Sequence, residues 1–487
     1  MATEAAWAIA AMVVSLVGVA LVMELWKASL GVPIFPASGD GNLTLASIKG
    51  VIEHGWYETN SNLGAPFGQV NHDYPLYIGE LGSILEIKAM ALYSSDVAVV
   101  LNMFVIVGYP LAALTGFLVL RALGFSRPVA LVCAVLFALA PFHFVRAQFH
   151  LFRRRAEGRS WRTWLSTRTL VTLCLCLLVG IGGLYYAAFT CLLVAIAAPL
   201  TAIAVRRWTV LVAAIAMIVT IGIPLAATAA PEVLYRAEHG TDLLVAQRYP
   251  SESLIYALPP MQLVLPLPGD RIPILADLRS RYDVDDQRVI LSEAPQGNSL
   301  GVVGTIGLVW LLVGLAAAGL GRPWREPLIR RTGTAALLAI VLGATAGAGA
   351  LFALIVTPQI RGWDRIVILI MFFALIGGPL LLQRAAAALG GRRRGRLVAA
   401  ARFAGTLCFG VFEGTTTSFV PPYAAEAAEW HLDGSFVAGI QHSLPRNAMV
   451  FELPTSPTPR PSPMGCTTPR CSSPTSIAPL CAGVPVR

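Results

Sequence analysis

Long uncharged stretches of apolar residues are the feature that most restricts how this chain can fold. Of its 487 residues, 56% are hydrophobic and 13% are charged, and the mean hydropathy is +0.68. Apolar runs near the ~20 residues that a hydrocarbon core of ~30 Å demands are typical of membrane-spanning helices. The sequence therefore predicts an all-α, polytopic transmembrane helix bundle. Its ten visible spans are 7–26, 97–120, 128–145, 168–185, 188–205, 208–228, 300–320, 333–356, 365–383 and 397–418.

Basic residues are concentrated in the short connections between these runs. The clusters together contain 20 basic residues and two acidic ones, whereas segment 27–95 contains three lysines and six acids, and segment 229–299 contains six arginines and ten acids. Cytoplasmic connections of membrane proteins are enriched in Lys and Arg. We therefore expect the two long segments to be extracytoplasmic loops. The net charge of +9 then reflects the membrane topology of the chain, and we expect no nucleic acid as a partner. The clusters lie at 121–127, 153–168, 206–207, 322–331 and 384–402.

One region breaks the regular alternation of spans. The chain should be outside after residue 145, yet the strongly basic stretch 153–168 follows within ten residues and should be inside. A span lost between His150 and Arg153 would explain this conflict and would give eleven spans in the intact form. A re-entrant segment over 142–152 is the alternative.

The carboxyl-terminal part divides by composition. Residues 419–454 read as a short extracytoplasmic segment with short elements near 436–440 and 449–453. From 455 to 487 the chain is rich in Pro, Ser, Thr, Cys and Arg without periodicity, which indicates a disordered or frameshifted tail. The transmembrane domain is thus expected over 1–418.

The first long loop carries the residues best suited to catalysis. Asp40 stands between two glycines shortly after the first span, and Asp73 is flanked by His72 and Tyr74. Two carboxylates on one loop beside a membrane suit general-base work on an acceptor hydroxyl or coordination of a divalent cation. The structural alternative is that Asp40 caps a helix beginning near Asn42 and that Asp73 starts a turn.

A second set of candidates lies between two late spans, on the side expected to be outside. Arg361 and Arg365 flank Trp363 there, against the general distribution of positive charge. A guanidinium fork suits an anionic lipid phosphate. An ion pair of an arginine with Asp364, with Trp363 anchored at the membrane interface, explains the same residues structurally.

Other features are weaker indicators. We assign Tyr185 and Tyr186 to an interfacial aromatic belt in preference to a ligand site. Tyr256 and Arg271 of the second long loop are weak candidates for covering the site. His143 is a weak candidate for substrate contact. The sequence contains no Walker loop, no HExxH, no metal-binding Cys cluster and no identifiable Ser/His/Asp triad.

Taken together, these motifs resemble those of the C-type (GT-C) membrane glycosyltransferases. The likeness extends over roughly 30–454 and is closest to a poorly characterised bacterial group of sugar-transferase-like proteins. A single amino-terminal helix is followed by a large loop that opens with an aspartate, and then by many spans. The motifs that carry the likeness are Gly39-Asp40-Gly41, residues 62–69 (NLGAPFGQ), 73–75 (DYP), 183–187 (GLYYA) and 361–365 (RGWDR).

The resemblance implies an activity and roles for individual residues. It implies inverting transfer of a sugar from a polyprenyl-phosphate donor to an extracytoplasmic glycan or lipid acceptor, at the outer face of the bacterial plasma membrane. Asp40 would be the catalytic base, and Asp73 the second carboxylate. Gly41 follows Asp40 where some members carry a second acid, so a divalent cation as cofactor stays open. The proposed substrate-binding residues are Arg361, Arg365, Trp363, His72 and Tyr74.

Two alternatives belong to other functional classes. A transporter or flippase of lipid-linked sugars would place ionisable residues mid-membrane and show repeat symmetry, whereas these spans are nearly free of charge. A non-catalytic membrane protein of envelope assembly is the other alternative, favoured by the conflict near residue 150.

Overall fold

The computed structural model is helical, as the sequence predicts. It describes residues 2–35, 40–64, 66–72, 79–146, 167–240, 248–286, 295–320, 327–387, 393–445 and 448–450. The longer helices are α1 (Ala2–Val22), α2 (Asp40–His54), α3 (Leu81–Ala91), α4 (Val97–Ala122), α5 (Arg127–Ala138), α7 (Thr167–Ile181), α8 (Leu184–Val205), α9 (Thr209–His239), α11 (Pro273–Asp286), α12 (Gly301–Gly319), α13 (Pro327–Gly343), α15 (Val367–Ala387), α16 (Arg393–Glu413) and α17 (Tyr423–Ser443).

Shorter elements fill the connections. The short helices are α6 (Pro141–Arg146), α10 (Glu252–Ile255), α14 (Ala348–Ile355), η1 (Leu25–Lys27), η3 (Pro260–Leu263), η4 (Pro295–Asn298), η5 (Trp363–Ile366) and η6 (Thr417–Phe419). Strands β1 (Thr59–Asn60) and β2 (Gln69–Val70) pair antiparallel within the first loop. In the part of the chain that the structure describes, these two strands form the one named sheet.

Several helices are long and apolar enough to cross a membrane, which confirms a polytopic helical fold. Six of the described helices meet this criterion by length and composition, and α16 with α17 meets it as a pair bent by 71°. The six are α1, α4, the stretch Arg127–Val145, α8, α9 and α12.

Several predicted spans have different boundaries in the structure, and 333–356 and 208–228 differ most. The predicted span 333–356 is broken, because α13 ends at Gly343 and α14 begins only at Ala348, with Ala346 in a left-handed conformation at φ 56°. The predicted span 208–228 continues as α9 to His239. Hydropathy marks where apolar residues end, whereas a helix can continue into water beyond that point.

The region after residue 418 also differs from the expectation. The predicted short element at 436–440 lies within the longer helix α17, which spans 423–443, and residues 451–453 of the other predicted element lie outside the described residues. The Tyr423 hydroxyl donates to the Met23 carbonyl oxygen at 2.6 Å, and Phe419 stacks on Phe144 at 4.9 Å. These contacts fix the start of α17 beside the end of α1. The suspected missing span near residue 150 and the tail 455–487 lie outside the described residues.

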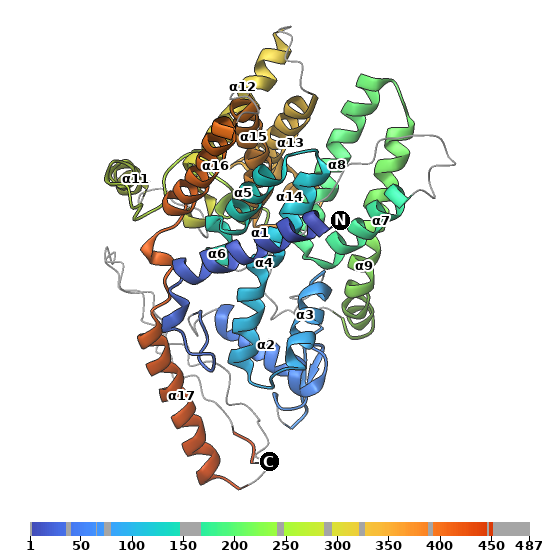
Figure 1. Ribbon diagram of the computed structural model, residues 1–487. Coiled ribbons are helices and arrows are strands. Elements are labelled where there is room, and N and C mark those ends of the chain that lie inside the picture. Colours follow the sequence, from blue (N-terminus) through green and yellow to red (C-terminus); the bar gives the residue numbers. More distant parts are fainter. Residues whose placement is uncertain are drawn as a thin grey trace.

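The helices form two groups that meet near residues 361–365, the turn that carries Arg361 and Arg365 and is called the arginine turn below. Figure 1 shows α7, α8 and α9 on one side, apart from α12, α13, α15 and α16. Helix α8 contacts both α13 and η5, so η5 lies where the groups meet. Within the second group α12 and α15 cross closely: a Cβ on Gly307 would lie 2.1 Å from the Ala374 carbonyl oxygen. Such small residues allow membrane helices to pack backbone to backbone.

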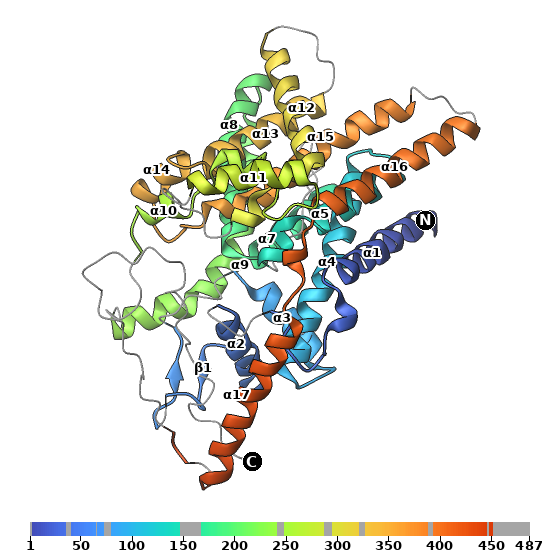
Figure 2. The same cartoon turned by 90° about the vertical axis from the view of Figure 1, so that its left-hand side faces the viewer.

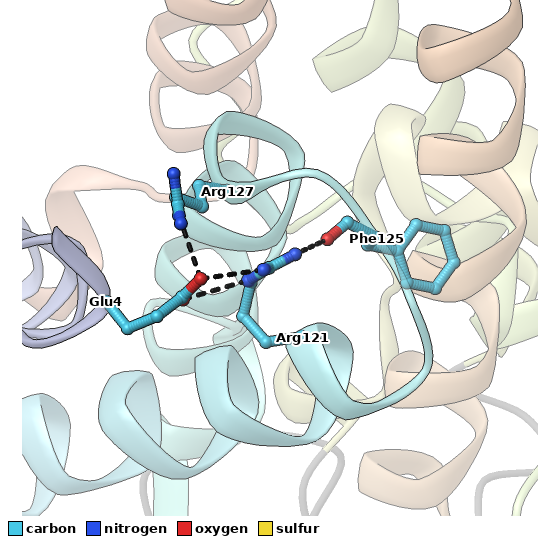
Figure 3. Close-up of polar contacts among 4 residues, drawn as sticks. All are labelled: Glu4, Arg121, Phe125 and Arg127. Atoms are coloured by element: carbon cyan, nitrogen blue, oxygen red, sulfur yellow. Dashed lines mark hydrogen bonds and ion pairs between the residues drawn. The ribbon is translucent and has the colours of Figure 1, made fainter. Parts of the chain in front are cut away.

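One end of the bundle is tied by a charged cluster. Glu4 of α1 accepts hydrogen bonds from Arg121 Nη2 and Nε at 2.8 and 3.1 Å and from Arg127 Nε at 2.8 Å (Figure 3). Arg121 also donates to the Phe125 carbonyl oxygen. The amino terminus and the α4–α5 connection therefore lie at the same end, as the predicted topology requires.

The first loop is organised at the opposite ends of α1 and α4. Both views show α2 and α3 together below the bundle, with α17 extending in the same direction (Figures 1 and 2). The buried side chain of Asn102 in α4 accepts from the Ile34 amide at 2.9 Å and donates to the carbonyl oxygens of Leu30 and Val32 at 3.0 and 2.8 Å. This residue therefore fixes the chain that leads from α1 toward Asp40.

Candidate functional site

The structure gives only part of the predicted catalytic loop. Asp40 is the first residue of α2, two positions before the helix start that the structural alternative assumed. Asp73 and Tyr74 lie outside the described residues, so their roles stay predictions.

His72 reaches the end of α9. Its ring stacks on Tyr235 with centroids 4.9 Å apart, and Tyr235 stacks in turn on His239 at 4.2 Å. Beside them Glu232 is 3% exposed, and neither of its carboxylate oxygens has a hydrogen-bond partner within the described chain. The sequence analysis did not single out Glu232. The feature of the sequence that could have identified it is an acidic residue in the last turns of a long apolar helix.

Arg361 is held between a carboxylate and an aromatic ring. Its Nη1 donates to Glu252 Oε2 at 2.8 Å, and its guanidinium carbon lies 4.4 Å from the centroid of the Tyr256 ring. Glu252 Oε1 accepts from the Tyr249 amide at 3.1 Å, and its Oε2 lies 3.7 Å from Arg248 Nη1. The side chains of Arg361 and Glu252 are 26% and 17% exposed, so solvent reaches both.

The electrostatics of this pair favour its charged form. Burial would raise the pKa of Glu252, but the hydrogen bonds from Arg361 and the Tyr249 amide, with the charges of Arg361 and Arg248, bring it below its ordinary value. Burial would lower the pKa of Arg361, but the hydrogen bond to Glu252, together with the charge interactions with Tyr256, Glu252 and Tyr185, raises it above its ordinary value. Both groups are therefore ionised at neutral pH.

Arg365 is the second cation of the same turn, and it also lies over a tyrosine. Its guanidinium carbon is 4.4 Å from the centroid of the Tyr185 ring, in the first turn of α8. Gly362 lies against both groups: a Cβ there would be 3.0 Å from Arg365 Nε and 3.4 Å from Tyr185 Cε1. Tyr185, which the sequence placed in an aromatic belt, thus supports one guanidinium, and Tyr256 of the second loop supports the other.

Glu80 brings a carboxylate of the first loop to this turn. Burial raises its pKa above the ordinary value, although the hydrogen bond from Ser83 Oγ at 3.0 Å and the charge of Arg365 oppose the rise. The group is therefore less readily ionised than an exposed glutamate. The sequence analysis missed Glu80, whose signal was an acid directly before the apolar residues of α3.

Backbone contacts hold Glu80 in place. The Gly79 carbonyl oxygen accepts from the Gly183 amide at 2.9 Å, and the Gly79 amide donates to Thr228 Oγ1 at 3.0 Å. Gly79 and Gly183 have φ values of 79° and 119°, which other residues rarely adopt. The end of the first loop is thereby joined to α8 and α9.

The arginine turn itself is fixed from within. Trp363 is 1% exposed and packs on Phe189 and Phe352, with ring centroids 5.6 and 5.8 Å away. The Asp364 amide donates to the Tyr256 carbonyl oxygen at 3.0 Å, which joins the second loop to the turn. Trp363 therefore supports the turn from the core side, beneath the arginines that flank it.

The remaining candidates lie elsewhere. His143 is fully buried in α6, where its Nδ1 lies 3.0 Å from the Ala138 carbonyl oxygen and its ring packs nearly at right angles to that of Phe137, so it is a core residue. The described residues include no group of three or more His, Cys, Asp or Glu side chains arranged to hold a metal ion. With Asp73 outside that part of the chain, a divalent cation stays a prediction.

Comparison with known proteins yields distant structural likenesses only. No protein-family model matches the sequence, and no curated protein matches it. The apo crystal structure of the Archaeoglobus fulgidus oligosaccharyltransferase is similar with a TM-score of 0.42 and 14% identity, over 85% of this chain and 56% of that one. The archaeal oligosaccharyltransferase AglB from the same organism, in complex with an inhibitory peptide and a dolichol-phosphate, gives 0.39 and 15%, over 83% and 55%. The chain thus spans little more than half the length of either, and likeness at this level assigns no residue a role.

Proposed function

We propose that this chain is a membrane glycosyltransferase that moves a sugar from a polyprenyl-phosphate-linked donor to an extracytoplasmic glycan or lipid acceptor. The observation that carries the proposal is the pair of guanidinium groups, Arg361 and Arg365, on one turn where both long loops meet. Each is stacked on a tyrosine ring at 4.4 Å. Planar cations fixed in this way offer hydrogen-bond donors to a phosphate while one flat face of each is covered.

The proposed reaction assigns each group a step. The Asp40 carboxylate takes the proton of the acceptor hydroxyl, whose oxygen forms the bond to the anomeric carbon. The bond from that carbon to the phosphate oxygen breaks, and its electron pair stays on the phosphate. Arg361 and Arg365 stabilise the negative charge of the departing polyprenyl phosphate. Attack from the face opposite the leaving group inverts the anomeric centre, and Asp73, with His72 and Tyr74 beside it, assists at the acceptor.

Binding of farnesyl phosphate, a short polyprenyl phosphate, to the purified full-length protein tests the proposal without knowledge of the sugar. A charge-assisted hydrogen bond is worth about 1.5–3 kcal/mol, so Arg361→Ala should weaken binding roughly 10- to 150-fold. Arg361→Lys should weaken binding less than Arg361→Ala does, because lysine keeps the positive charge. It should still bind more weakly than the wild type, because lysine lacks the planar pair of donors of the guanidinium. Farnesol, which lacks the phosphate, should bind all variants equally.

The matched control is Arg281→Ala, which removes an exposed arginine that pairs with Asp277 at 2.7 Å in α11. It should bind farnesyl phosphate like the wild type. If Arg361→Ala and Arg365→Ala, both folded, also bind it like the wild type, the arginines do not hold the phosphate and the proposed donor site is wrong.

The acceptor step has its own test. Once a sugar donor is identified, Asp40→Asn should lower turnover by about 10²–10⁴-fold with farnesyl phosphate binding unchanged. Unchanged turnover in that variant would remove Asp40 from the mechanism.

A further inference from the structure

The ion pair of Arg361 with Glu252 raises a question about the proposed donor site. Glu252 Oε2 lies 2.8 Å from Arg361 Nη1. One face of the guanidinium lies over Tyr256, so an incoming anion must approach at the edge of the group. A carboxylate and a phosphate bind that edge through the same N–H donors. Glu252 therefore occupies hydrogen-bonding capacity that a donor phosphate needs.

A second arginine, Arg248, is close enough to pair with Glu252 in place of Arg361. The Glu252 Oε2 atom already lies 3.7 Å from Arg248 Nη1, while its Oε1 accepts the Tyr249 amide. Removing the only partner of a partly buried carboxylate is costly. Because Arg248 lies four residues before Glu252, with its Nη1 already 3.7 Å from Oε2, the carboxylate can leave Arg361 and stay paired.

Local geometry allows this movement to be small. Glu252 begins the four-residue helix α10, and its side chain is 17% exposed. The backbone of the segment is anchored further along, where the Leu258 amide donates to the Gly343 carbonyl oxygen at 2.8 Å. A side-chain rotation can therefore exchange the partners of Glu252 while Tyr256 stays beneath Arg361.

We propose that Glu252 is a specificity-determining counter-charge of the donor site, which holds Arg361 in the absence of donor and moves to Arg248 when a polyprenyl phosphate binds. This inference rests on the proposed function, since it takes Arg361 as a phosphate ligand. An anion enters only if it competes with Glu252 for the guanidinium edge. Weakly basic anions are thereby excluded, and a phosphate is favoured.

Two variants with opposite expected effects test the exchange. Glu252→Gln keeps the shape but removes the competing charge, so farnesyl phosphate should bind roughly 2- to 5-fold more tightly, as expected for loss of one competing ion pair. Arg248→Gln removes the alternative partner, so Glu252 stays on Arg361 and binding should weaken by a similar factor. The control Asp277→Asn breaks an ion pair in α11 and should leave binding unchanged.

The outcomes separate this inference from the function on which it rests. If Glu252→Gln binds farnesyl phosphate as the wild type does or more weakly, Glu252 orients Arg361 and does not compete, and the exchange is refuted. If Glu252→Gln does not fold, Arg248→Gln decides: unchanged or tighter binding refutes the exchange. Arg361→Ala is measured alongside. If Arg361→Ala binds farnesyl phosphate weakly and Glu252→Gln does not bind it more tightly, only the exchange is rejected. If Arg361→Ala binds it like the wild type, the donor site itself is rejected.

Discussion

Replacing Gly362 by alanine tests whether the position of Arg365 over Tyr185 matters. A Cβ at Gly362 would lie 3.0 Å from Arg365 Nε, 3.3 Å from its Cδ and 3.4 Å from Tyr185 Cε1. Contacts of 3.0–3.4 Å are tighter than nearly all real Cβ contacts, so the arginine must move by a few tenths of an ångström. The backbone itself tolerates alanine, because Gly362 has a φ of −77°.

The size of the effect follows from the contact that is disturbed. A partly exposed cation–π contact is worth about 0.5–2 kcal/mol. Loss of about 1 kcal/mol of this preorganisation should weaken farnesyl phosphate binding about fivefold. Equilibrium binding and thermal unfolding of the full-length protein in detergent measure the two consequences separately, and the unfolding midpoint should change little.

A glycine in open space is the matched control. At Gly31 an added Cβ meets nothing within 4 Å, so Gly31→Ala should bind farnesyl phosphate like the wild type. If Gly362→Ala folds and binds normally while Arg365→Ala binds weakly, the guanidinium acts without needing its place on Tyr185. The reasoning from the stacked geometry would then be wrong.

Two further predictions concern the ion pairs at the two ends of the bundle. Glu4→Gln should lower the thermal unfolding midpoint at low salt and less so at high salt, because it weakens the bonds to Arg121 and Arg127; equal midpoints at low salt would show that the cluster contributes nothing. The pair of Glu252 with Arg361 should stabilise the fold above the unfolded-state pKa of the glutamate, and this stabilisation should be lost as the pH falls through the lowered folded-state pKa of Glu252; an acid unfolding curve identical in Glu252→Gln would contradict this.

The site was predictable to the extent that single residues break a local pattern. Arg361 and Arg365 were found because cations on that side oppose the distribution of charge in the rest of the chain. Glu80 and Glu252 were missed because each is one acid among several in a loop, and nothing local distinguishes an acid that meets an arginine over a hundred positions away. Tyr185 was assigned to an aromatic belt, since a sequence shows a ring at a helix end but not the guanidinium above it.

Boundaries were predicted well only where hydropathy determines them. The run 97–120 became α4 almost unchanged, because burial in hydrocarbon and helix length impose the same limits. The run 333–356 was divided between α13 and α14, where the backbone turns beside Leu258 of the second loop. That partner is distant in sequence, so hydropathy along the chain could not reveal the break.

The sequence by itself determined the class of fold and which ends of the helices lie together. Apolar runs of membrane length must be helical, since a backbone in hydrocarbon has to satisfy its own hydrogen bonds. The clustering of arginines gave the alternation of spans that the Glu4 cluster reflects at one end. Only the tertiary structure decided which side chains meet at the arginine turn. Tyr185, Glu80 and the pair Glu252 and Tyr256 come from three separate segments. Their contacts with two guanidiniums depend on how the helix groups pack, a property that no local pattern of residues contains.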